Sequence, residues 1–276
     1  GNLIVFKKGK KSAKSKLMVS AHMDEVGLMV TDITSDGYLK FDEVGGIDRR
    51  VLPGKRVCVG SNGLNGVIGV KPIHLTNGDE KTAVPKMNDM YIDIGAESRE
   101  DALKYVNYGD GINFEGDFKI NGKTVVTKAL DDRFGCYVLI NLIKSEPEYD
   151  MYFTFVVQEE VGLRGARPAA FTVNPDFALV IESTTAADVA EVDASHQVCN
   201  LSKGATVTVM DRATVYDKEM ISAAFELAEK NNIAVQYKRA VAGGNDSGAI
   251  HQSRGGVRTL AVSLPSRYIH APSTAA

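Results

Sequence analysis

Histidine and carboxylate side chains follow four apolar runs that are typical of buried strands, and two more acidic residues precede a helical pattern. The runs are 17–21, 152–157, 177–181 and 260–264. The polar residues beside these segments are His22, Asp24, Asp131, Asp132, Glu159, Glu160, Glu182 and His270. In open α/β sheets, ligands bind beyond the carboxyl ends of the strands. We therefore expect these side chains to meet at one edge of a sheet.

This group of residues has the composition of a metal site. Two imidazoles with several carboxylates and no thiolate suit a divalent ion such as Zn²⁺, Mn²⁺ or Co²⁺, and their number favours two ions. The expected ligands are His22, Asp131, Glu160, Glu182 and His270. Their three negative charges face the four positive charges of two ions, so a bridging water would readily become a hydroxide nucleophile.

Two further acidic residues have expected roles at this site. Glu159 is left over as a general base that accepts the proton of the water. Adjacent residues of a regular strand point to opposite faces, so the strand must end or twist for Glu159 and Glu160 both to reach the site. Asp24, two residues after His22, could hold the second N–H of the imidazole.

The surrounding pattern predicts a discontinuous α/β domain. Between 27 and 125, short β-rich runs separated by Gly, Asn and Asp indicate a small barrel or sandwich, interrupted by one helix at 98–106. After 128, strands alternate with helices, which indicates an α/β layer with a largely parallel sheet. The expected helices there are 134–144, 217–232, which Asp217 can cap, and 246–254. We expect a catalytic domain of 1–26 and 126–276 with a β module of 27–125 inserted.

Composition excludes several classes of protein. The 276 residues are 44% hydrophobic and 24% charged with a net charge of −3, which fits a globular chain that can bury a full core. That charge argues against a nucleic-acid partner, whose binding surface would be basic. No run approaches the roughly 18 apolar residues of a membrane span. Three Cys without a CxxC spacing fit free thiols in a reducing, cytoplasmic compartment.

The two ends of the chain lack ordinary terminal features. The sequence begins without Met, directly before the apolar run 3–6, and it stops at Ala276 without a closing helix or polar tail. We expect trimming at both ends.

Several long motifs carry a family resemblance that spans nearly the whole chain. They are 21–27, 71–74, 129–133, 158–166, 243–248 and 267–270. Together they resemble the M42 family of metallo-aminopeptidases, the glutamyl or deblocking aminopeptidases, some of which were once described as endoglucanases. The resemblance implies a three-layer, zinc-exopeptidase-like α/β catalytic domain with an inserted PDZ-like β-barrel that mediates dimerisation. It also implies dimers that assemble into a tetrahedral dodecamer.

The resemblance also implies roles for individual residues. One metal would be held by His22 and Glu182, the other by Glu160 and His270, with Asp131 bridging both and Glu159 as the base. It further implies a cis peptide bond between Asp131 and Asp132. This chain has Glu182 where many relatives have Asp, and it lacks the helical segments that the family has at both ends.

The segment with two glycines before Asp246 allows two interpretations. Gly244, Asp246 and Ser247 could form a substrate-binding loop, or they could be only a turn and a helix cap. Asp132 and Arg133 could likewise do no more than cap the following helix.

We therefore expect a dinuclear aminopeptidase that needs two divalent ions (Zn, Co or Mn) and acts on the amino-terminal residues of peptides. One alternative is a glycoside hydrolase of the endoglucanase type, which needs two carboxylates about 5–10 Å apart and no paired His. The other is a metal-free scaffold protein that contributes only assembly surface. The preferred amino-terminal residue, the native metal and the oligomer size stay open.

Overall fold

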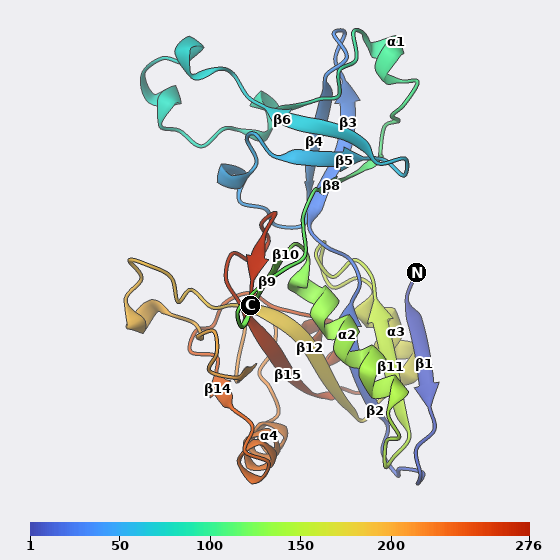
Figure 1. Ribbon diagram of the computed structural model, residues 1–276. Coiled ribbons are helices and arrows are strands. Elements are labelled where there is room, and N and C mark those ends of the chain that lie inside the picture. The colour runs from blue at the N-terminus through green and yellow to red at the C-terminus, as the bar shows by residue number, and fades with distance from the viewer. The chain divides into compact units, whose positions relative to one another are not determined.

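The computed structural model describes residues 1–276, and the chain forms two compact units (Figure 1). The first unit consists of residues 1–25, 120–269 and 274–276. The second consists of residues 26–119 and 270–273. None of the helices has the length and apolar character needed to cross a membrane.

The first unit is built on a seven-stranded sheet with the order β1-β11-β2-β12-β15-β13-β14. Its strands β11, β2, β12 and β15 are parallel to one another. Strand β1 runs antiparallel to β11 and β13 runs antiparallel to β15, whereas the edge strand β14 is parallel to β13. The strand bounds are β1 Leu3–Lys7, β2 Leu17–His22, β11 Met151–Val156, β12 Phe177–Thr185, β13 Ala205–Val207, β14 Val235–Tyr237 and β15 Arg258–Ser266. The carboxyl ends of the parallel strands therefore share one edge, as the sequence predicts.

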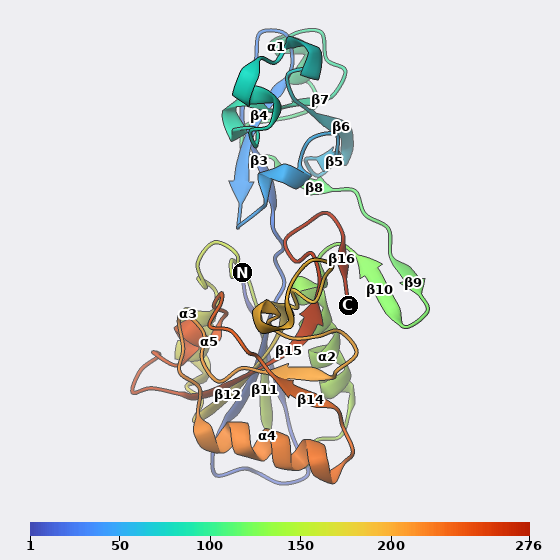
Figure 2. The ribbon, with the colours of Figure 1, turned by 90° about the vertical axis from the view of Figure 1, so that its left-hand side faces the viewer.

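Helices cover both faces of this sheet. Successive β2 residues enter different cores: Met18 packs in the core that contains residues of α3, α4 and α5, and Val19 packs with Leu139 of α2. Figure 2 shows α2 on one side of the strands and α3 and α5 on the other. The helix bounds are α2 Leu130–Lys144, α3 Ala166–Val173, α4 Lys218–Lys230 and α5 Ser247–Ile250. The expected mixed α/β fold is confirmed.

Three helical segments differ from the sequence expectation. The helix expected at 98–106 is the short α1, Arg99–Ala102, because the chain then turns to bury Val106 in the core of the second unit. The helix expected at 246–254 stops at Ile250, before Arg254 with φ 50° and two glycines. Helix α3 was not among the expected helices. Pro168 stands inside it, in the first turn, where a proline removes no helical hydrogen bond.

The second unit is a closed β-barrel with the strand order β3-β4-β7-β6-β5-β8. The bounds are β3 Gly27–Ile33, β4 Leu39–Val44, β5 Arg56–Val59, β6 Leu64–Gly69, β7 Tyr91–Asp93 and β8 Gly111–Phe114. Its interior is filled by fully buried side chains such as Ile33, Leu39 and Ile92. Closure leaves the sheet without open edges.

The remaining elements are short. A three-stranded sheet has the order β16-β10-β9, with β9 Lys119–Asn121, β10 Thr124–Thr127 and β16 Thr274–Ala275. Single 3₁₀ turns lie at Arg49–Val51, Ile73–Leu75, Gly78–Lys81, Met87–Asp89 and Ala194–His196.

Asp217 begins α4 as the sequence predicts and also forms an ion pair. Its Oδ1 accepts a hydrogen bond of 2.9 Å from the backbone N–H of Met220. Arg258, at the start of β15, donates to both carboxylate oxygens over 2.6 and 2.9 Å. The hydrogen bonds from Arg258 lower the pKa of Asp217 to about 2.

This pKa predicts a pH-dependent contribution to stability. Because the folded pKa lies below that of an unfolded aspartate, the contribution is complete above about pH 4 and is lost as the pH falls toward 2. Asp217→Asn keeps the helix cap but loses the charge, so the variant should be less stable than the parent at pH 6 and nearly equal to it near pH 2. Urea unfolding followed by circular dichroism measures this difference. In the control Asp193→Asn, on an exposed loop, the difference in unfolding free energy between variant and parent should be the same at both pH values.

Candidate metal centre

His22 is the last residue of β2 and lies buried among oxygen atoms. Its side chain is 1% exposed. Nε2 lies 3.2 Å from Oδ1 of Asp131 and 3.3 Å from Oε1 of Glu182. Donor atoms of these three residues all lie within 4.8 Å of one another, which is the spacing of ligands around one ion.

The strand register explains why these residues meet. Strand β2 pairs with β12 so that Ser20 lies opposite Val180, and two residues further along come His22 and Glu182. On its other side β2 pairs with β11, with His22 opposite Val156. The chain leaving β11 therefore passes the same edge of the sheet, and it carries Glu159 and Glu160.

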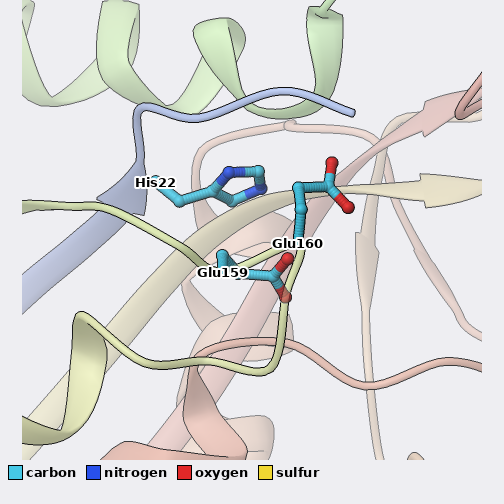
Figure 3. Close-up of side chains that lie close together, drawn as sticks. All are labelled: His22, Glu159 and Glu160. Carbon is cyan, nitrogen blue, oxygen red and sulfur yellow. The ribbon is translucent and has the colours of Figure 1, made fainter. Parts of the chain in front are cut away.

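A sharp turn brings both glutamates toward His22. Strand β11 ends at Val156, and Gln158 adopts a left-handed conformation with φ 61°. The turn is closed by the N–H of Leu163, which donates to the carbonyl of Glu159 over 2.9 Å. Donor atoms of Glu159, Glu160 and His22 all lie within 4.8 Å of one another, and Figure 3 shows the two carboxylates beside the imidazole. The strand ends before the pair, as this arrangement requires.

Asp24 holds the turn through its side chain and the imidazole through its main chain. The carboxylate accepts hydrogen bonds from the backbone N–H groups of Glu159 and Glu160 over 3.1 and 3.2 Å. His22 Nδ1 lies 3.0 Å from the main-chain oxygen of Asp24 but 3.6 Å from the carboxylate. Burial opposes ionisation of Asp24, but its hydrogen bonds with His22 and the two N–H groups outweigh this and lower its pKa. The expected contact with the imidazole is therefore made mainly by the carbonyl.

Asp132 is a structural member of the site that the sequence did not distinguish from a helix cap. Its carboxylate accepts from the N–H of Gly135 over 2.9 Å and from the N–H of His22 over 3.3 Å. It thus joins the start of α2 to the end of β2. A Cβ at Gly135 would stand 2.3 Å from this carboxylate, so the glycine three residues after Asp132 was the available signal. The peptide bond between Asp131 and Asp132 is cis, as the family resemblance implies.

The site concentrates negative charge where water is scarce. Burial and neighbouring carboxylates raise the pKa values of Glu182 and Asp132. Burial disfavours the charged form of His22, but Glu182, Asp131 and Asp24 outweigh it and raise its pKa. Oε2 of Glu182 is buried without a hydrogen-bond partner. A divalent cation would displace the protons and supply that oxygen with a partner, so these residues fit a metal ion.

The remaining residues expected at the site are His270, Gly244, Asp246 and Ser247. His270 begins the segment 270–273 of the second unit and has φ 59°. Asp246 and Ser247 are fully buried, whereas Gly244 is exposed. Burial raises the pKa of Asp246, and Glu159 adds to this shift. The roles of these four residues stay predictions.

Comparison with known proteins identifies the family. The family model of the M42 glutamyl aminopeptidases matches residues 1–276. The chain belongs to the M42 family. A putative aminopeptidase of Acetivibrio thermocellus is 44% identical over 99% of this chain and 80% of its own length. The chain is thus a member of a family of peptide hydrolases.

Solved structures of TET peptidases have the same fold. The TET aminopeptidase of a marine sediment archaeon, Thaumarchaeota archaeon SCGC AB-539-E09, matches with a TM-score of 0.94 at 34% identity, over 100% of this chain and 79% of that one. The TET1 peptidase of Pyrococcus horikoshii, which can assemble into a tetrahedron or a large octahedral shell, matches with a TM-score of 0.85 at 38% identity, over 100% and 82% of the two chains.

The geometry at His22 predicts that Glu182 contributes directly to metal affinity. Glu182→Ala removes a carboxylate oxygen 3.3 Å from Nε2 of His22, and we expect at least a tenfold loss of zinc affinity, since even indirect partners of metal ligands are worth 10–100-fold. Zinc bound per chain, measured by elemental analysis in chelator-buffered solutions, tests this. The control Glu226→Ala, exposed on α4, should bind zinc as the parent does. Unchanged affinity in Glu182→Ala would remove Glu182 from the ligand set.

Proposed function

We propose that this chain is a dinuclear metal-dependent aminopeptidase. The observation that carries the proposal is the buried cluster of His22, Asp131 and Glu182 with Glu159 and Glu160 beside it, in a chain of the M42 family. In this proposal His22 and Glu182 would hold one ion, Glu160 and His270 would hold the other, and Asp131 would be a ligand shared by both. Divalent ions held by such ligands polarise a carbonyl group and make water more acidic.

Glu159 is the proposed general base. It is adjacent to a proposed ligand, and its backbone N–H is held by Asp24 over 3.1 Å, which limits the freedom of its main chain. A carboxylate in this place can take a proton from the attacking water and deliver it to the amine that leaves when the peptide bond breaks. The free α-amino group of the substrate would lie close to the acidic side chains, which explains selection of chain ends.

The substrate loop and the assembly are further parts of the proposal. Gly244, Asp246 and Ser247 are proposed to shape the substrate site, with the two buried residues fixing the loop. The β-barrel unit is proposed as a dimerisation surface of a homo-oligomer, in line with the assemblies of the Pyrococcus horikoshii TET1 peptidase. Three free cysteines fit the proposed cytoplasmic location, where thiols stay reduced.

Replacing Glu159 by Gln tests the role of the base. The amide cannot accept the proton, so turnover of an aminoacyl-p-nitroanilide should fall at least about a hundredfold, while both metal ions stay bound. The control Glu226→Gln changes the same group on the exposed face of α4 and should be fully active. Near-normal turnover in Glu159→Gln would exclude it as the base.

Metal removal separates this proposal from its alternatives. Treatment with EDTA should abolish hydrolysis of aminoacyl substrates, and Zn²⁺, Co²⁺ or Mn²⁺ added separately should restore it. A glycosidase with two catalytic carboxylates needs no metal, so EDTA-resistant cleavage of a soluble cellulose would support that alternative. Less than one equivalent of metal per chain, in protein purified without chelator, would support the scaffold.

A further inference from the structure

The loop that carries His270 is closed at its base by a short backbone bridge. After β15 ends at Ser266, the N–H of Arg267 donates to the carbonyl of Ala275 over 2.8 Å, and the N–H of Ala275 donates back over 3.1 Å. The hydroxyl of Thr274 also donates to the carbonyl of Tyr268 over 3.3 Å. Residues 268–274 therefore leave and re-enter the fold at one point.

The backbone of this loop needs external support. Tyr268 and His270 both have φ 59°, a left-handed backbone conformation that residues other than glycine rarely adopt. Such conformations persist only where the surrounding structure enforces them. Contacts at the base of the loop can supply such support.

An ion pair at the base of the loop supplies such a constraint. Arg267 donates from Nε to Oδ1 of Asp188 over 2.8 Å and from Nη2 to Oδ2 over 3.0 Å. Two parallel bonds fix the rotation of the guanidinium as well as its distance. The Asp188 side chain is 9% exposed, and it also accepts from the N–H of Leu201 over 2.9 Å. The arginine is therefore tied to an anchored partner.

The same anchor joins the two strands that lead to proposed metal ligands. Asp188 lies just beyond the end of β12, the strand of Glu182, while Arg267 directly follows β15, which leads to His270. The N–H of Ala186 donates to the carbonyl of Ser266 over 2.9 Å and extends this link. Arg267 is therefore tied both to the chain that follows β12 and to the base of the loop.

We propose that the ion pair of Asp188 and Arg267 positions His270 for metal binding. The inference rests on the proposed function, because it takes His270 as a ligand. Asp188 and Arg267 are positioning residues: they fix the base of the loop, and His270 alone supplies the donor atom. Loss of the ion pair should lower the affinity for the metal ion that His270 holds, and it should leave unchanged the affinity for the ion held by His22 and Glu182.

The opposite end of β15 provides a matched control. There Arg258 forms the same two-bond pair with Asp217, over 2.6 and 2.9 Å, but this pair joins β15 to the start of α4. Arg258→Lys and Arg267→Lys are the same chemical change at the two ends of one strand. Lysine keeps the charge and cannot make the two-bond contact.

The experiment measures zinc binding to the metal-depleted full chain with Zn²⁺ alone as the probe. The parent should bind two ions per chain in chelator-buffered titrations. In Arg267→Lys and in Asp188→Asn, one of the two ions should bind about tenfold or more weakly, the scale found for partners of metal ligands. His270→Ala should lower the affinity for the same ion by a larger factor. Arg258→Lys should bind both ions as the parent does.

Saturating zinc adds a readout that a purely structural role would not move. At high Zn²⁺, Arg267→Lys and Asp188→Asn should regain most of the parental kcat, whereas His270→Ala should not. Circular dichroism of the metal-depleted variants verifies that each is folded. If Arg267→Lys does not fold, Asp188→Asn alone tests the proposal.

Three results would overturn the proposal. Parental zinc affinity in both Arg267→Lys and Asp188→Asn would show that the pair does not position His270. Equal weakening of both ions in Arg267→Lys and Arg258→Lys would show a general effect on the fold. Parental binding in His270→Ala would remove His270 as a ligand. A parent chain that binds no zinc would instead contradict the proposed function itself.

Discussion

The burial of several carboxylates around one imidazole is the constraint on which the candidate site depends. Carboxylates removed from water repel one another and are costly to ionise unless a cation neutralises them. His22, Glu182 and Asp132 all lie at 5% exposure or less, so solvent screens their charges poorly. Burial and neighbouring carboxylates raise the pKa of Glu182, and the surrounding carboxylates raise the pKa of His22, so the cluster favours a bound positive charge, whether a proton or a cation.

Backbone hydrogen bonds hold these charged groups in place. Asp24 fixes the main chain of Glu159 and Glu160, and Asp132 fixes the main chain of His22. The thiol of Cys136 donates to the carbonyl of His22 over 3.1 Å, so residues of α2 hold both the backbone N–H and the backbone carbonyl of His22. Acidic side chains thus do two different things here: some cluster with His22 at the candidate metal site, and others hold the backbone that presents them.

The sheet supplies the common edge for these interactions. Parallel pairing of β2 with β11 and β12 brings together three chain segments that are far apart in the sequence. The backbone of Gln158 is in the left-handed conformation, and the turn after β11 therefore brings two consecutive glutamates close to His22. Each unit has its own hydrophobic core. In the closed barrel every strand pairs with a neighbour on both sides, so no sheet edge is left open.

The sequence by itself determined the strands before His22, Glu159 and Glu182, the cap of α4 and the all-β character of the second unit, because apolar runs, turns and caps are local patterns. It also indicated the metal-type donor set, because residue type alone limits what a side chain can coordinate. Only the tertiary structure decided that Asp132 and Asp24 hold backbone N–H groups, that α1 and α5 are short, and that Asp188 pairs with Arg267. The hydrogen bonds and the ion pair among these features join residues that are distant along the chain: His22 and Asp132 are separated by 110 positions, and Asp24 and Glu159 by 135. Local spacing carries no record of such partners, since long-range packing decides which hydrogen bonds form.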